Sequence, residues 1–117
     1  MGLFRQRHKR RQGRGGKADP VDVAHLEQFA HTRVGVEAFV EPPTTMTETT
    51  IVLVAQNGEW TRRRVGSADS ARSLGRRLAI PVYDVAATGY PQRMRQWTAQ
   101  RKASGETGVP GLEGPSV

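Results

Sequence analysis

Residues 51–65 read IVLVAQNGEWTRRRV, and this stretch decides the fold. Its first four residues are continuously apolar rather than alternating, which is typical of a central strand covered on both faces. Asn57-Gly58 follows, and both residues tolerate the positive φ angles of a type I′ turn. The stretch therefore predicts a β-hairpin, with one strand within residues 47–55 and its antiparallel partner within residues 59–65.

The segment before the hairpin predicts a helix. Asp19 and Pro20 suit the N-cap and the first helical position, because the Asp side chain accepts from free amides and proline lacks only an amide that would be unpaired there. Val23, Leu26 and Phe29 then recur at helical spacing. We expect a helix over residues 20–32.

A third strand is expected between this helix and the hairpin, over residues 34–41. Its apolar residues alternate, which is the period of a half-buried strand, at Val34, Val36, Ala38 and Val40. Pro42-Pro43 should end it.

After the hairpin, a second helix, a short strand and a last helix are expected. Ser67 suits the N-cap of the second helix, which Pro81 should end. Its apolar residues share one face, at Ala68, Ala71, Leu74 and Leu78. Residues 82–85 read as a short strand, and Pro91 can open a helix that runs to about Lys102.

The predicted class is α+β, in the order helix, three-stranded antiparallel meander, helix, short strand and C-terminal helix. The simplest packing lays the helices across one face of the sheet. A chain of 117 residues suffices for one core, so residues 19–102 are expected to form a single domain. Residues 103–117 are rich in Gly and Pro and are expected to be a disordered tail.

Composition excludes several protein classes. The chain has no cysteine, so disulfides, thiolate chemistry and cysteine-based zinc sites are excluded. No run of about 18 apolar residues could cross a bilayer, and basic rather than apolar residues follow the first ones. We therefore expect no transmembrane insertion, no secretory signal and a cytoplasmic location.

The net charge of +7 is concentrated in residues 1–18, the basic arm. The cations of the arm are Arg5, Arg7, Lys9, Arg10, Arg11, Arg14 and Lys17, with no carboxylate among them. The arm contains four glycines and no hydrophobic periodicity, so we expect it to be disordered. Such a cluster gains most by displacing counterions from a polyanion, which points to RNA, DNA or a ribonucleoprotein surface. A solubilising tail or a loose membrane-surface tether are the alternatives.

Further cations could extend a nucleic-acid-binding surface. Strand alternation places Trp60, Arg62 and Arg64 on one face and Arg63 on the other. An exposed Trp60 flanked by two cations would suit stacking on an unpaired base.

In the alternative, which we favour, Trp60 is a core residue and the arginines pair with carboxylates across the sheet, at Glu37, Glu41 or Glu48. Arg72 and Arg76 lie one turn apart on the second helix, with Arg77 alongside. They could extend the basic surface, or they could simply form a solvated helix face.

No catalytic, metal-binding or cofactor-binding constellation stands out. His25 and His31 are six residues apart on a helix and do not share a face. The glycines at 13, 15 and 16 do not follow a strand, as those of a phosphate-binding loop would. A hidden active site could lie near Asp84 and Tyr90, although a single Asp without a partner is more often structural. Residues 90–97 form an aromatic and basic segment that reads as a docking patch or as core contacts of the last helix.

Two resemblances can be drawn. The order of elements between Asp19 and Leu78 is similar to the topology of double-stranded-RNA-binding domains, although Ser67-Ala68-Asp69-Ser70 stands where those domains carry a lysine cluster. Residues 35–42 (GVEAFVEP), 57–65 (NGEWTRRRV), 80–85 (IPVYDV) and 89–94 (GYPQRM) resemble a family of small uncharacterised actinobacterial proteins over about residues 20–100. That family implies no established activity, and this chain has no redox residue or cofactor motif to support an oxidoreductase label.

Three functional hypotheses follow. The leading one is a non-enzymatic accessory protein that binds RNA, a ribosomal surface or DNA, with the arm supplying affinity and the domain supplying position. The second is a protein-interaction module whose arm tethers it to an anionic surface. The third is an enzyme, which would need a pocket with converging polar groups.

Overall fold

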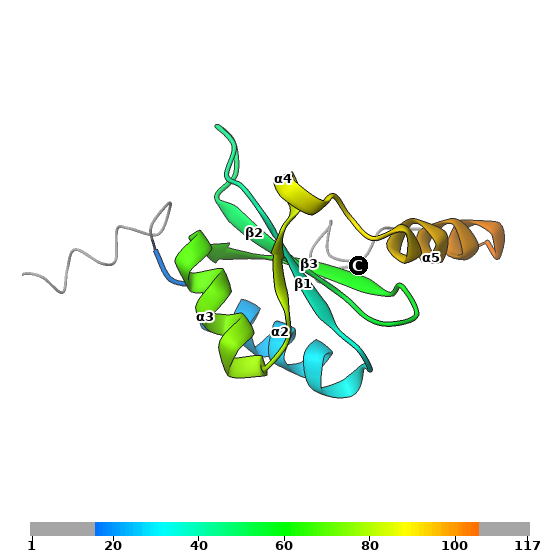
Figure 1. The fold of residues 1–117 in the computed structure, drawn as a ribbon, viewed down its shortest axis with the longest axis horizontal. Helices are drawn as coiled ribbons and strands as arrows, with labels where there is room; N and C mark the ends of the chain where they lie inside the picture. The colour runs from blue at the N-terminus through cyan, green and yellow to red at the C-terminus, as the bar shows by residue number, and fades with distance from the viewer. Residues whose placement is uncertain (1–15, 106–117) are drawn as a thin grey trace, which may run out of the picture.

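The computed structural model describes residues 16–105, and their elements are of the expected α+β class (Figure 1). In chain order they are α2 (Pro20–Thr32), β1 (Glu37–Glu41), β2 (Thr49–Val54), β3 (Trp60–Gly66), α3 (Ala68–Leu78), β4 (Val82–Asp84), α4 (Val85–Thr88) and α5 (Gln92–Ala103). The disorder expected of the basic arm and of the tail falls almost entirely outside the described residues.

The strands form one four-stranded mixed sheet in the order β3-β2-β1-β4. The hairpin β2–β3 and the pair β1–β2 are antiparallel, as expected of the meander. The short strand β4, however, pairs parallel to β1, with Phe39 opposite Tyr83. The chain leaves β3 at one edge, crosses the sheet through α3 and returns at the other edge, which makes a parallel pairing possible. Sequence periodicity indicated the strand but not its partner.

The expectation that all helices lie across one face is wrong. Helices α2 and α3 cover one face, and α5 lies on the other (Figure 1). The first core cluster includes Leu26, Phe29, Ala71, Leu74, Ala38, Val40, Ile51, Leu53 and Val65. The second consists of Phe39, Val52, Val54, Trp60 and Met94. The prediction that β2 is covered on both faces is therefore confirmed, because the α2/α3 layer and α5 share it.

Strand β1 is buried more completely than its alternating pattern indicated. It begins at Glu37 rather than at Val34, whose side chain is 72% exposed. Ala38 and Val40 face α2 and α3, as predicted. Phe39 is also buried, at 5% exposure, because α5 and Tyr90 cover the second face. A half-buried strand was expected because the apolar residues at 34, 36, 38 and 40 alternate, and that pattern indicated burial of one face only.

The hairpin reverses where Asn57-Gly58 predicted, but its turn is not type I′. Gly58 has a φ of +97°, whereas Asn57 is not among the positive-φ residues of the described chain. The amide of Gly58 donates to the carbonyl of Ala55 at 2.9 Å, and that of Glu59 donates to Oδ1 of Asn57 at 3.0 Å. Only the glycine uses the left-handed region, as in three-residue hairpin loops.

The helix termini follow local sequence signals with two differences. Asp19 caps α2 through the amide of Val21, and Ser67 caps α3 through that of Ser70, as predicted. Helix α3 ends at Leu78 with Ala79 in the left-handed conformation, before Pro81 is reached. The single turn α4 was not expected.

Candidate functional site

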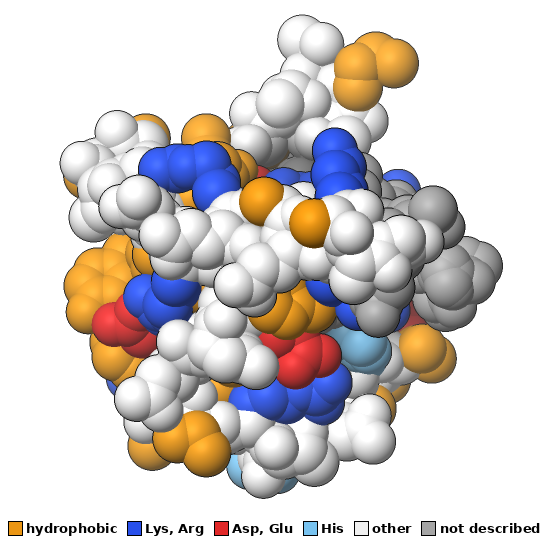
Figure 2. Space-filling model, turned by 90° about the vertical axis from the view of Figure 1, so that its right-hand side faces the viewer, with side chains coloured by type: hydrophobic (Ala, Val, Ile, Leu, Met, Phe, Trp, Pro, Cys, Tyr) orange, Lys and Arg blue, Asp and Glu red, His pale blue; other side chains and the backbone are white. Residues whose placement is uncertain are grey.

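The carboxylates of the folded part are all engaged by other groups within it. Asp19 and Asp84 accept from backbone amides at the starts of α2 and α4. Every other Asp or Glu between residues 16 and 105 pairs with an arginine: Glu59 with Arg33, Glu41 with Arg62, Asp22 with Arg63, Glu48 with Arg64, Asp69 with Arg72, Glu27 with Arg77 and Glu37 with Arg93. Figure 2 shows red carboxylate side chains lying against blue cations on one face.

Trp60 belongs to the core and not to an exposed platform. Its side chain is 5% exposed and packs with Met94 and Val54. Its Nε1 donates to Oγ1 of Thr98 on α5 at 3.0 Å, which satisfies the one polar group of the ring. Because α5 covers this end of the sheet, an unpaired base cannot stack on Trp60. The stacking interpretation is wrong, and the core interpretation is confirmed.

Arg62 is held in a polar cluster rather than presented to solvent. It donates from Nε and Nη2 to the two oxygens of Glu41, at 2.9 and 3.0 Å, and its guanidinium lies 5.3 Å from the centre of the Trp60 ring. Thr50 and Tyr90 also donate to the Glu41 carboxylate. Burial alone would raise the pKa of Glu41, but these three donors outweigh it and lower that pKa. Burial and the bond to Glu41 raise the pKa of Tyr90, so its hydroxyl stays protonated.

The other cations proposed from the sequence differ in how available they are. Arg64 is 68% exposed and only loosely paired with Glu48 at 4.0 Å. Arg72 is exposed but bound to Asp69 at 2.9 Å on its own helix. Arg76 and Lys17 are exposed, and no residue in the range 16–105 forms an ion pair with either. The remaining six arm cations, from Arg5 to Arg14, lie outside the described residues.

Asp84 and Tyr90 do not converge on one site. The carboxylate of Asp84 accepts from the amide of Ala86 at 3.0 Å and so caps α4. Tyr90 lines an open hollow of about 220 Å³ on the second face, together with Glu37, Phe39, Tyr83 and residues 88, 89 and 91. Asp84 is not part of its lining.

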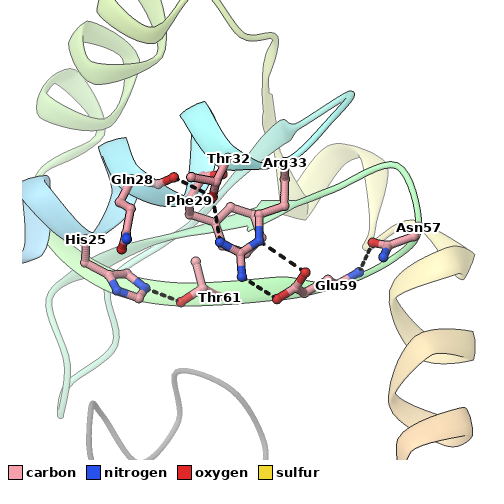
Figure 3. Close-up of polar contacts among 8 residues, drawn as sticks. All are labelled: His25, Gln28, Phe29, Thr32, Arg33, Asn57, Glu59 and Thr61. Atoms are coloured by element: carbon pink, nitrogen blue, oxygen red, sulfur yellow. Dashed lines mark hydrogen bonds and ion pairs between the residues drawn. The ribbon is translucent and has the colours of Figure 1, made fainter.

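A second polar cluster joins α2 to the hairpin (Figure 3). Arg33, at the end of α2, donates to both oxygens of Glu59, at 3.1 and 2.7 Å, and its guanidinium lies 4.5 Å from the centre of the Phe29 ring. Nearer the start of α2, Nε2 of His25 lies 2.7 Å from Oγ1 of Thr61 on β3. Thr61 is only 4% exposed, so this pair fixes the helix against the sheet.

His25 makes the stability of the fold pH-dependent. Burial and the neighbouring Arg63 lower its pKa below the ordinary value of 6.5, and Asp22 only partly opposes them. The unfolded chain therefore binds this proton at a higher pH than the folded one. Its contribution to stability is complete above pH 6.5 and declines as the pH falls through the folded-state pKa. By contrast, the Glu41 contribution begins to decline only below the ordinary carboxyl value of 4.5.

We expect the free energy of unfolding in urea to decrease as the pH is lowered from 6.5 toward 4.5, and to decrease less in His25→Gln. The glutamine has no titrating group, and its amide can still form a hydrogen bond with the hydroxyl of Thr61. An unchanged pH dependence in His25→Gln would show that another group is responsible.

Two further available cations lie on α5: Arg95, which belongs to the segment 90–97 considered above as a docking patch, and Lys102, which was not selected from the sequence. Arg95 and Lys102 are exposed, and neither has an ion-pair partner within the described part of the chain. The signal was present, because the helix sequence QRMRQWTAQRKA contains no acidic residue. Only the structure shows which of its cations face outward.

Comparison with known proteins adds no assignment: no family model matches the chain, and neither a curated protein nor a solved structure does. The two resemblances drawn from the sequence stay predictions. No helix within residues 16–105 combines the length and the apolar character needed to cross a membrane.

Proposed function

We propose that this protein is a non-enzymatic accessory protein that binds nucleic acid (RNA, DNA or a ribosomal surface) through its basic arm. The observation that carries the proposal is the engagement of every carboxylate between residues 16 and 105 by a cap or an arginine. The folded part thus offers no unengaged carboxylate that could neutralise the seven cations of the arm. A polyanion is the partner that gains most, since each phosphate contact releases a counterion.

The arm would supply most of the affinity, and the folded part would determine how the protein is positioned on the nucleic acid. The arm joins the domain at Lys17, which is exposed and lies beside Arg64 around a cavity of about 470 Å³. Arg77, which pairs with Glu27 at 2.5 Å, and Lys17 both line a second cavity on the α3 side. Carboxylates line both cavities as well, at Asp19, Asp22 and Glu48 in the first and at Asp69 in the second. The base of the arm therefore carries charges of both signs, and the surplus of positive charge lies in the arm itself.

The test is a salt titration of binding to mixed-sequence RNA and duplex DNA. It compares the parent chain with a variant in which the six arm cations from Arg5 to Arg14 become Gln. For duplex DNA the slope of log K against log salt should fall by roughly five units, at about 0.9 per lost phosphate contact. The control replaces Arg33, Arg62 and Arg93, which are already bound to carboxylates, by Lys and should keep the parent slope.

The proposal fails if the parent chain binds neither nucleic acid above background at moderate salt. It also fails if the arm variant binds as tightly and with the same slope. Binding to anionic vesicles but not to nucleic acid would favour the alternative in which the arm tethers a protein-interaction module to an acidic surface.

A further inference from the structure

Helix α5 is anchored to the sheet by one side only. Met94 is 8% exposed in the second core cluster, and Trp97 packs against that cluster. Arg93 donates to the carbonyl of Ala55 at 2.9 Å and to Glu37 at 2.7 Å. Together with the bond from Trp60 to Thr98, these contacts fix the direction of the helix. The face opposite them is free of contacts with the sheet.

The outward face of α5 has an unusual composition. Its exposed residues are Gln92, Arg95, Gln96, Ala99, Gln100, Lys102 and Ala103. At 3.6 residues per turn, Gln92, Gln96 and Ala99 form its central ridge, and Arg95 and Lys102 lie along one flank, about two turns apart. The helix contains neither a carboxylate nor a large exposed apolar side chain. Arginine, glutamine and alanine are residues that contact base edges and thymine methyl groups in DNA.

Helix α5 projects from the rest of the domain, so a partner can approach its outward face along the length of the helix. Figure 1 shows the C-terminal half of α5 running past the tip of the β2–β3 hairpin, away from α2 and α3. A helix with side chains is about 10–12 Å wide, which matches a B-DNA major groove about 12 Å wide and 8.5 Å deep. The major groove of A-form RNA is too narrow to admit it.

We propose that the outward face of α5 enters the major groove of duplex DNA. Gln92, Gln96 and Ala99 face the base edges, and Arg95 and Lys102 contact the phosphates of one strand. This inference rests on the proposed function and narrows the nucleic-acid partner to duplex DNA. The arm supplies the counterion-release affinity, and α5 sets the orientation of the domain on the duplex.

The first test measures protection of guanine N7, which lies in the major groove, from methylation by dimethyl sulfate. The substrate is a mixed-sequence DNA duplex of about 30 base pairs, saturated with full-length protein. The parent should protect guanines from methylation. Arg95→Gln/Lys102→Gln should lose this protection and reduce the salt slope by about 1.8 units, at about 0.9 per phosphate contact. Ala99→Glu, which places a carboxylate on the exposed ridge, should also abolish protection without unfolding the chain.

The comparison variant is Arg72→Gln/Arg76→Gln, which removes the same charge from α3 in the opposite layer. At saturation it should keep the guanine protection whatever its affinity, because α3 is not the helix assigned to the groove. If the parent binds duplex DNA through its arm but protects no guanine N7, the groove inference is overturned and the proposed function stands. Equal affinity for a DNA and an RNA duplex of the same sequence would overturn it in the same way. If no nucleic acid binds at all, both fail.

Discussion

Glu41→Ala is expected to lower the free energy of unfolding by roughly 2 to 4 kcal/mol, because it removes the shared partner of three donors. The side chain of Glu41 is 13% exposed and that of Arg62 is 25% exposed, so Arg62 would be left partly buried without a counter-charge. Thr50 and Tyr90 would lose their acceptor as well. The residual exposure of Arg62 lets water compensate in part, which places the loss below that of a fully buried pair. Chemical denaturation followed by circular dichroism measures it.

Two companion variants separate the burial effect from the ion pair itself. Asp69→Ala removes an exposed pair, with side chains 55% and 94% exposed, and should cost at most about 1 kcal/mol. Glu41→Leu/Arg62→Met replaces both charges by apolar groups and should recover most of the loss, because the penalty comes from an unpaired buried charge. Equal costs for Glu41→Ala and Asp69→Ala would contradict the view that the partial burial of the Glu41–Arg62 pair is what makes its loss costly.

Gly58→Ala is expected to cost roughly 2 to 4 kcal/mol and to loosen α5 from the sheet. The residue has a φ of +97°, which strains any side chain. An added Cβ would also collide with the backbone carbonyl of Arg93 and lie 2.9 Å from Cβ of Trp97, so α5 would have to move away. Both tryptophans of the chain lie at this contact, and their fluorescence should shift to the red below the main unfolding transition.

Gly89→Ala is the control for backbone strain without a collision. Its φ is +73°, but an added Cβ would have no neighbour within 4 Å. This variant should lose stability through strain alone and keep the parent tryptophan emission. If Gly58→Ala also kept the parent emission, the close approach of the hairpin to α5 would not determine where that helix lies.

The candidate site was predictable only in part, and the arginines show why. Strand alternation correctly placed Arg62 and Arg63 on opposite faces, and the pairing of Arg62 with Glu41 and of Arg64 with Glu48 was among the expected alternatives. Glu37, however, pairs with Arg93 from α5 instead of with the hairpin arginines. A carboxylate partner 56 residues away in sequence depends on where a helix docks, and no local pattern carries that information.

By itself, the sequence determined the local structure: α2 begins after Asp19, α3 begins after Ser67, the hairpin reverses around Gly58, and β2 is apolar on both faces. These features depend on backbone preferences and on capping groups a few residues apart, so they are present in any short window of the chain. Only the tertiary structure decided that β4 lies parallel to β1, that α5 covers Trp60 on the face opposite α2 and α3, and that Arg95 and Lys102 face outward. Those outcomes depend on the burial of apolar surface between segments far apart in the chain, which local periodicity does not encode.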